Sequence, residues 1–207
     1  MVRAVVLAAG ASSRMGQAKS IMPLGQTGET VISRVVRTLL DSGLPSVTVV
    51  GGPHFSSIRD VLAPGDHRVR VIEHQGWAEG QLSSLLVGLD AANDPLLEAL
   101  LVTLADVPLV QPATVRAVLK AWRTTRAPIV RPVDGTRHGH PVVFDRSVFD
   151  ELKAADPQVG AKAVFAAHLA RVLDVPVNDE GAFLDLDTPD DYARATQLIR
   201  ERGSSDQ

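Results

Sequence analysis

The sequence predicts an α/β fold in which helices cover both faces of a mostly parallel sheet. Over more than half of the 207 residues, short apolar runs bounded by Gly, Pro or Asp alternate with longer stretches of helical periodicity. Unbroken apolar runs are typical of strands that are covered on both faces. Regular alternation of strands with helices favours a parallel sheet within one layered domain.

The elements before residue 128 follow from this pattern. The expected strands are residues 3–8, 46–51, 69–73 and 100–104. The expected helices are residues 31–40, 82–92 and 113–122. Gly43 follows the first helix, where glycine favours a helix C-terminus, and Pro112 precedes the third, where proline favours a start.

After about Pro128 the pattern loosens into short strands and short helices. The last helix has the clearest start signal, because Thr188-Pro189-Asp190-Asp191 offers an N-cap hydroxyl, a proline at the first helical position and an acid at the capping-box position. We expect this helix to end near Arg202 and residues 203–207 to form a flexible tail. The chain is therefore expected to form one domain over residues 1–202.

Composition and charge exclude several classes of function. Lys and Arg total 21 against 24 Asp and Glu, so no basic surplus is available for a nucleic-acid backbone. The absence of Cys excludes disulfides, thiolate metal sites and thiol catalysis. No run reaches the ~18 apolar residues of a membrane span, and the run after Arg3 is too short for a secretory signal. We expect a soluble cytoplasmic protein with neither nucleic-acid nor membrane partners.

A glycine-rich loop, LAAGASSRMGQAK at residues 7–19, follows the first strand. Gly10 and Gly16 allow positive φ and a close approach of backbone N–H groups to phosphate oxygens. Arg14 and Lys19 add positive charge where a triphosphate would lie. The spacing matches neither GxGxxG nor GxxxxGK[ST]. We interpret the loop as a triphosphate-binding loop; the alternative is a Gly/Ser-rich turn with two solvated cations.

Two carboxylates are expected at the same edge of the sheet. Asp106 follows an apolar strand and Asp187 directly precedes the last helix. Ligands of open α/β sheets bind beyond the carboxyl ends of the strands. Two oxygen donors from separate loops, together with phosphate oxygens and water, suit Mg²⁺. Either residue is alternatively a turn or capping residue, and Asp185 is interpreted as structural.

The histidines and Trp77 give weaker signals. His138 and His140 would share one face of a strand, but without a third soft ligand substrate contact or packing is favoured over a metal site. Trp77 would either shield a base-binding pocket or pack in the core. The remaining histidines that we interpret as surface or loop residues are His54, His67, His74 and His168. Since no GxSxG elbow occurs, covalent acyl chemistry has no support.

The loop at residues 7–19 resembles the LAAGxSxRMGxxK signature of the MobA-like nucleotidyltransferases. Further segments are similar to motifs of that family, in chain order GMxxSLxxG at 80–88, LxDMP at 104–108, GHPVLF at 139–144, GDxGAR at 156–162 and the start of DIDTPED at 185–189. The molybdenum cofactor cytidylyltransferase branch is the most similar. The guanylyltransferase branch typically has Gly where this chain has Ala9, whose Cβ would crowd a purine.

This resemblance implies a Rossmann-like three-layer sandwich of the nucleotide-diphospho-sugar transferase type. Its nucleotide-binding half would end at about residue 127, and its acceptor-binding half would cover about 128–202. The implied reaction is Mg²⁺-dependent transfer of CMP from CTP to the terminal phosphate of the molybdopterin cofactor, with release of pyrophosphate. The implied protein partner is a molybdoenzyme or its chaperone.

The resemblance also implies roles for individual residues. The implied catalytic residues are Arg14, Lys19 and Asp106. The implied nucleotide-binding residues are Leu7, Ala8, Ala9, Gly10, Ser12, Arg14, Lys19, Gly80 and Ser84. The implied metal ligands are Asp106 and Asp187, and the implied acceptor-binding residues are His140 and Lys162.

Three alternatives remain open at this point. The first is a nucleotidyltransferase that uses GTP or another phosphorylated acceptor. The second is an NAD(P)H-dependent oxidoreductase on the same fold, although the chain has no suitable acidic ribose-binding residue about 20 residues beyond the loop. The third is a non-catalytic nucleotide-binding module. The joint presence of Arg14, Lys19, Asp106 and Asp187 argues against a decayed site.

Overall fold

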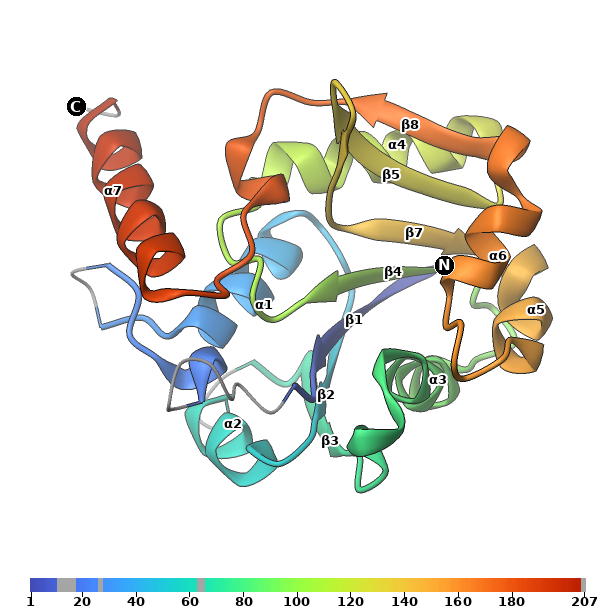
Figure 1. Ribbon diagram of the computed structural model, residues 1–207, viewed down its shortest axis with the longest axis horizontal. Helices are drawn as coiled ribbons and strands as arrows, with labels where there is room; N and C mark the ends of the chain where they lie inside the picture. The colour runs from blue at the N-terminus through green and yellow to red at the C-terminus, as the bar shows by residue number, and fades with distance from the viewer. Residues whose placement is uncertain (11–17, 26–27, 63–65, 206–207) are drawn as a thin grey trace.

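A mixed sheet runs through the middle of the molecule in the computed structural model, which describes residues 1–10, 18–25, 28–62 and 66–205 (Figure 1). Within these residues the sheet has eight strands in the order β3-β2-β1-β4-β7-β5-β6, and β8 pairs with β5. The strands are β1 Val2–Ala8, β2 Val47–Gly51, β3 Val69–Glu73, β4 Ala99–Leu104, β5 Ile129–Asp134, β6 Arg137–His138, β7 Val142–Asp145 and β8 Val172–Pro176.

The two halves of the chain contribute differently to this sheet. β1, β2, β3 and β4 pair in parallel, and their bounds lie within one residue of those expected. In the second half, β7 is antiparallel to both β4 and β5, β6 is antiparallel to β5, and β8 is parallel to β5. The predicted α/β class is confirmed, and the pairing of β7 with β4 joins the two halves in one continuous sheet.

Helices cover both faces of the sheet (Figure 1). They are α1 Val31–Asp41, α2 Phe55–Leu62, α3 Gln81–Ala92, α4 Pro112–Thr125, α5 Phe149–Ala154, α6 Lys162–Ala167 and α7 Pro189–Ser205. α1, α2 and α4 enclose one apolar core, whereas α3, α5 and α6 enclose a second core on the opposite face. Successive residues of β1 alternate between the two, with Ala4 and Val6 in the first core and Val5 and Leu7 in the second. This double burial explains the unbroken apolar runs.

The last helix begins as predicted. Asp191 Oδ2 accepts hydrogen bonds from the backbone N–H and the hydroxyl of Thr188, both at 2.8 Å, and Thr188 Oγ1 accepts from the N–H of Asp191 at 3.2 Å. This reciprocal pair is a capping box. The helix continues to Ser205, so the end expected near Arg202 was placed three residues too early. Among the described residues, no helix combines the length and apolar character needed to cross a membrane.

Candidate active site

Segments from three parts of the chain meet beyond the carboxyl ends of β1 and β4. The N–H of Ala105 donates to the carbonyl of Leu7 at 3.0 Å, which ties the segment after β4 to β1. The N–H of Leu186 donates to the carbonyl of Asp106 at 2.8 Å, which ties the same segment to the residues before α7. Lys19 Nζ lies 2.7 Å from Asp187 Oδ1. Lys19, Asp106 and Asp187 therefore lie together at the edge of the sheet where the sequence predicted them.

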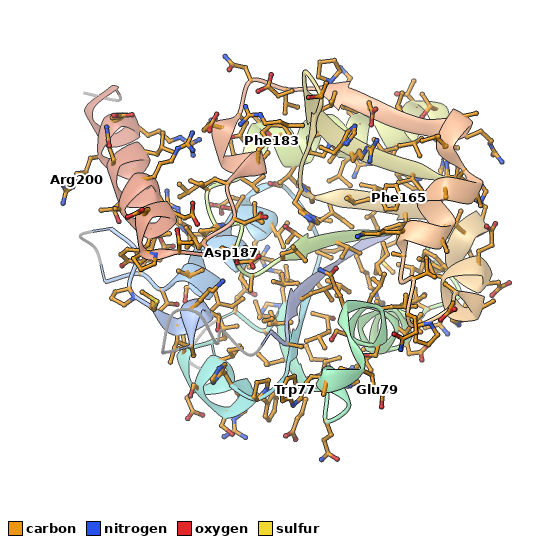
Figure 2. The ribbon with its side chains drawn as sticks, viewed as in Figure 1. Trp77, Glu79, Phe165, Phe183, Asp187 and Arg200 are labelled. Carbon is orange, nitrogen blue, oxygen red and sulfur yellow. The ribbon has the colours of Figure 1, made fainter. Side chains whose placement is uncertain are left out.

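Asp187 is not a helix cap, because Thr188 and Asp191 cap α7 between them. Its carboxylate pairs with Lys19, whose side chain is only 13% exposed. Figure 2 shows Asp187 on the segment that leads into α7, on the side facing the sheet edge. The capping alternative considered from the sequence is thus excluded by the hydrogen bonds of the neighbouring residues.

Asp106 carries a buried carboxyl oxygen, Oδ1, for which no hydrogen-bond partner exists in the described part of the chain. Burial raises the pKa of Asp106, and the nearby charges of Asp185 and Asp187 raise it further, while Lys19 lowers it. Burial and the charge of Asp187 also raise the pKa of Asp185. A bound cation would stabilise such a buried carboxylate.

The donor set fits a divalent metal whose coordination is completed by substrate. Among the described residues, no group of three or more His, Cys, Asp and Glu side chains is arranged to hold a metal by itself. Mg²⁺ is commonly bound by one or two carboxylates together with phosphate oxygens and several waters. Asp106 and Asp187 fit this kind of Mg²⁺ site, with two carboxylates and substrate oxygens, better than a metal site whose ligands all come from the protein.

Two neighbouring cavities open at this edge. We call the first, of about 360 Å³, the Trp77 cavity; it is lined by Leu7, Ala9, Gly10, Trp77, Ala78, Gly80, Gln81, Ser84, Leu104 and Asp106. A smaller hollow of about 80 Å³ adjoins it at Leu7, Gly10 and Asp106 and adds Ala8, Lys19, Ser20 and Ala105. Backbone from the glycine-rich loop, the start of α3 and the end of β4 thus surrounds the Asp106 carboxyl group.

The second cavity, of about 430 Å³, is the Phe165 cavity, which shares Leu7, Gln81 and Leu104 with the first. Its apolar walls include Phe144 and Phe165, and its described lining contains Arg131 and Lys162 but neither Asp nor Glu. The Arg131 guanidinium lies 5.4 Å from the centre of the Phe165 ring. Its Nε donates to Asp174 at 2.7 Å. The cavity therefore has the charge that suits an anionic ligand with an apolar body.

His140 lies deep in the Phe165 cavity. Its Nδ1 is buried and has no hydrogen-bond partner in the ranges that the structure describes. Burial lowers the pKa of His140, although the charge of Asp106 raises it in part. His140 thus lines the cavity with its Nδ1 buried behind the cavity surface. His138 is exposed and lies 3.8 Å from Asp174, so the two histidines do not form a metal pair.

The predicted site residues fall into three groups. Those that line the Trp77 cavity or the hollow beside it are Leu7, Ala8, Ala9, Gly10, Lys19, Gly80, Ser84 and Asp106. His140 and Lys162 line the Phe165 cavity, and Asp187 reaches the site through its pair with Lys19. Ser12 and Arg14, and with them Gly16, lie outside the described residues.

One expectation was wrong. The φ angle of Gly10 is not in the left-handed region, so glycine is not required there by its backbone conformation. His74 lies in the loop after β3, one of the two places expected for it, but it is buried, and its Nε2 lies 2.8 Å from Ser83 Oγ. Burial of His74 depends on the turn and helix that follow it, which a reading of β3 alone does not reveal.

Sequence reasoning also missed Arg131 and Phe165. A lone arginine in an apolar strand and a phenylalanine in a short helix carry no local signal. They meet only because β5 and α6 pack together on one face of the sheet.

The model of the MobA-like NTP transferase domain matches residues 4–172. The chain belongs to the MobA-like NTP transferase family. As a member, it is a nucleotidyltransferase, and its three-layer fold is the one predicted. The match includes the glycine-rich loop, β4 with Asp106, and the segment that carries His140 and Lys162.

Two curated relatives can be aligned with nearly the whole chain, at low sequence identity. The chain is 23% identical over 197 residues to molybdenum cofactor cytidylyltransferase from Escherichia coli (strain K12), which covers 95% of this chain and 96% of that protein. It is 28% identical over 194 residues to the purine catabolism protein PucB from Bacillus subtilis (strain 168), covering 91% and 92%.

Two solved structures of a related protein support the fold, and one of them is a complex with a metal. The crystal structure of Rv0371c from Mycobacterium tuberculosis H37Rv matches with a TM-score of 0.78 and 30% identity, covering 95% of this chain and 97% of that one. A structure of Rv0371c in complex with manganese matches with a TM-score of 0.72 and 31% identity, covering 95% and 98%. A divalent metal is thus present in a structure of a relative.

Proposed function

We propose that the protein transfers CMP from CTP to the terminal phosphate of the molybdopterin cofactor and releases pyrophosphate. The observation that carries this proposal is the meeting of the two cavities at Leu7, Gln81 and Leu104, beside the buried carboxyl of Asp106. A nucleotide in one cavity and an acceptor in the other would place their reacting phosphates at this junction.

The Trp77 cavity would bind the nucleotide. Trp77 and Gly80 form one wall, where a base would lie, and Ala9 with Gly10 forms the wall next to Lys19. The ammonium group of Lys19 would stabilise the departing pyrophosphate, because a fixed charge near developing negative charge lowers the barrier. Ala9 lines the same cavity, and its Cβ would leave less room for a purine than Gly would, which favours cytosine.

The Phe165 cavity would bind the acceptor. Its apolar walls suit a flat ring system, and Arg131 and Lys162 suit a phosphate. A terminal phosphate has a second pKa of about 6, so at pH 7 its oxygen needs no strong base before it attacks the α-phosphorus. The new P–O bond forms as the bond to the β-phosphate breaks. His140, which lines this cavity, would contact the acceptor.

Asp106 and Asp187 would hold Mg²⁺. The ion, when bound, would supply charge neutralisation at the α-phosphate and the attacking oxygen. The protein's own part in this step is to keep Asp106 in a buried position and Asp187 close to Lys19. Catalysis would then depend on position and fixed charge rather than on proton transfer. The product would be delivered to a molybdoenzyme or its chaperone.

Binding followed by turnover tests this proposal. Thermal unfolding is measured with Mg²⁺ and CTP, GTP, ATP, UTP or NADPH in turn. A ligand at 100 times its dissociation constant adds about 2.7 kcal/mol, and each kcal/mol corresponds to about 2–4 °C for a chain of this size. We expect a Mg²⁺-dependent shift with CTP, followed by transfer of label from α-³²P-CTP to molybdopterin.

Three outcomes would contradict parts of the proposal. A larger shift with GTP than with CTP would reject cytosine as the preferred base. The variant Ala9→Gly serves as the control, because it removes the Cβ that narrows the Trp77 cavity. Labelling of another phosphorylated acceptor, but not of molybdopterin, would reject the acceptor. A shift with NADPH and with none of the triphosphates would reject nucleotidyl transfer by this protein.

A further inference from the structure

One wall of the Trp77 cavity is a short turn between β3 and α3. It consists of the 3₁₀ helix η2, Trp77–Glu79, followed by Gly80 at the N-cap of α3. Trp77, Ala78 and Gly80 line the cavity. Figure 2 shows Trp77 and Glu79 on this turn, beyond the edge of the sheet and beside α3. The position of the turn therefore determines the shape of the cavity on that side.

Two hydrogen bonds fix the end of this turn. His74 Nε2 lies 2.8 Å from Ser83 Oγ, and Ser83 Oγ donates to the carbonyl of Gly80 at 2.7 Å. A serine hydroxyl has a single proton. Since that proton goes to Gly80, the bond to His74 must be donated by the Nε2–H of the imidazole. His74 is 9% exposed, so water competes little for this pair.

His74 also attaches the turn to the sheet. Its backbone N–H donates to the carbonyl of Gly51 at the end of β2, at a distance of 2.8 Å. Gly52, which follows Gly51, packs closely against Ala9: a Cβ atom on Gly52 would lie 2.6 Å from the carbonyl oxygen of Ala9. A continuous series of contacts therefore runs from Ala9, on one side of the Trp77 cavity, through the edge of β2 to His74.

Gly80 has a conformation that these contacts help to hold. Its φ of +110° is one that glycine adopts freely and that side-chain-bearing residues rarely do. The Gly80 N–H donates to the carbonyl of Trp77 at 3.3 Å, and the Ser83 hydroxyl adds a hydrogen bond at the Gly80 carbonyl. His74 orients that hydroxyl.

We propose that His74 is a positioning residue that sets the base preference of the Trp77 cavity. It acts through Ser83 on Gly80 and thereby fixes the wall against which the base lies. This inference rests on the proposed nucleotide site but not on the identity of the acceptor. It requires His74 to influence which triphosphate binds, without touching the reacting phosphates.

The test is equilibrium binding of CTP, UTP, GTP and ATP in the presence of Mg²⁺, measured by calorimetry. In His74→Ala and in Ser83→Ala we expect the dissociation constant for CTP to rise about tenfold, the equivalent of one buried hydrogen bond. We also expect the ratio of GTP to CTP dissociation constants to fall several-fold, because a loosened wall discriminates less. In turnover assays the KM for CTP should rise while kcat stays within about twofold.

Conservative and control variants separate positioning from general stability. His74→Gln places an amide N–H near the location of Nε2 and should restore most of the affinity and the base ratio. His67→Ala removes a histidine whose side chain is 95% exposed and should change neither. Ser83→Ala tests the same relay if His74→Ala is too unstable to purify.

The outcomes distinguish this inference from the proposed function. A wild-type protein that binds none of the four triphosphates overturns both. A wild-type protein that binds CTP, with His74→Ala and Ser83→Ala showing unchanged base ratios, overturns the inference and leaves the proposed function intact. An equal loss of affinity for all four nucleotides also overturns it, because that is the effect of a structural role alone.

Discussion

We expect the buried carboxyl group of Asp106 to lower the stability of the ligand-free protein, although the proposed activity requires it. Its Oδ1 is buried without a hydrogen-bond donor in the described ranges, and its pKa is raised by burial and by Asp185 and Asp187. Replacing it by Asn removes the buried charge and keeps the shape. We expect Asp106→Asn to unfold at a higher temperature than the wild type in the absence of ligand, and to turn over about 100- to 1,000-fold more slowly.

The magnitude follows from the contacts of the carboxyl group. A buried acceptor without a partner costs about 1–3 kcal/mol, and a charged one costs more. The Asn oxygen would remain without a donor, and the attraction between Lys19 and the carboxylate would be lost. About 1 kcal/mol of net gain remains, equivalent to about 2–4 °C for a chain of this length.

The sign of the pH dependence follows from the raised pKa of Asp106. A carboxyl group whose pKa is higher in the folded state favours folding below its unfolded pKa, and this contribution is lost as pH rises through the folded pKa. The advantage of Asp106→Asn over the wild type should therefore be present at pH 8 and disappear near pH 4.

Chemical denaturation at pH 8, with and without Mg²⁺ and CTP, measures this effect. The free variant should be the more stable protein, whereas with ligand the order should reverse, because only the wild type keeps the carboxylate. Asp60→Asn alters the net charge equally at an exposed site, 69% exposed, and should change stability by less than about 0.5 kcal/mol. A free Asp106→Asn protein less stable than the wild type would refute the electrostatic argument.

Three further predictions concern other parts of the molecule. Lys19→Ala should lower kcat for CMP transfer about 100- to 1,000-fold. It should also lower the melting temperature while the protein stays folded, because Asp106 and Asp187 lose their cation. Near-wild-type turnover would remove Lys19 from the mechanism. Burial lowers the pKa of His140 in the folded protein below the unfolded value of about 6.5. The neutral histidine therefore contributes to the free energy of unfolding above pH 6.5, and this contribution is lost as the pH falls towards the folded pKa. In urea denaturation, the free energy of unfolding should therefore fall less between pH 7.5 and pH 5.5 for His140→Gln than for the wild type. An equal fall in both proteins would contradict this prediction. Asp179, 4% exposed, accepts from Gln111, Thr114, Gly181 and Arg202. Asp179→Ala should lower the free energy of unfolding by about 2–4 kcal/mol, because the buried donors of Thr114 and Gly181 lose their acceptor. A loss below 1 kcal/mol in urea titration would show that these donors find other partners.

How much of the fold the sequence predicts depends on how local each signal is. The start of α7 was predicted correctly because a capping box needs only the residues from Thr188 to Asp191. The first strands were predicted because each is buried on both faces over its own length. α2 was not predicted, since Phe55–Leu62 is short and only Ile58 is buried among its residues. The pairing of β5 with β8, 38 or more residues apart, leaves no local pattern.

The same distinction applies to the candidate site. Asp106 was predicted at this edge because it follows a parallel strand, and the structure places it there beside Lys19. Asp187 reaches the same edge through its pair with Lys19, although no strand directly precedes it. The Phe165 cavity was not foreseen, because Arg131 and Phe165 come together only through tertiary packing.

The residues ahead of α7 explain how a capping carboxylate and a carboxylate that pairs with Lys19 can stand four positions apart. The Thr188 hydroxyl and backbone N–H groups hold the pKa of Asp191 below its usual range, which keeps that residue ionised as the cap. The cap accepts the N–H of Asp187 as well, at 3.2 Å, and so fixes the Asp187 backbone while leaving its side chain to Lys19. A helix terminus satisfied by one carboxylate thus releases the other for charge neutralisation at the sheet edge. The capping box that made α7 easy to predict is also the device that orients Asp187 towards the site.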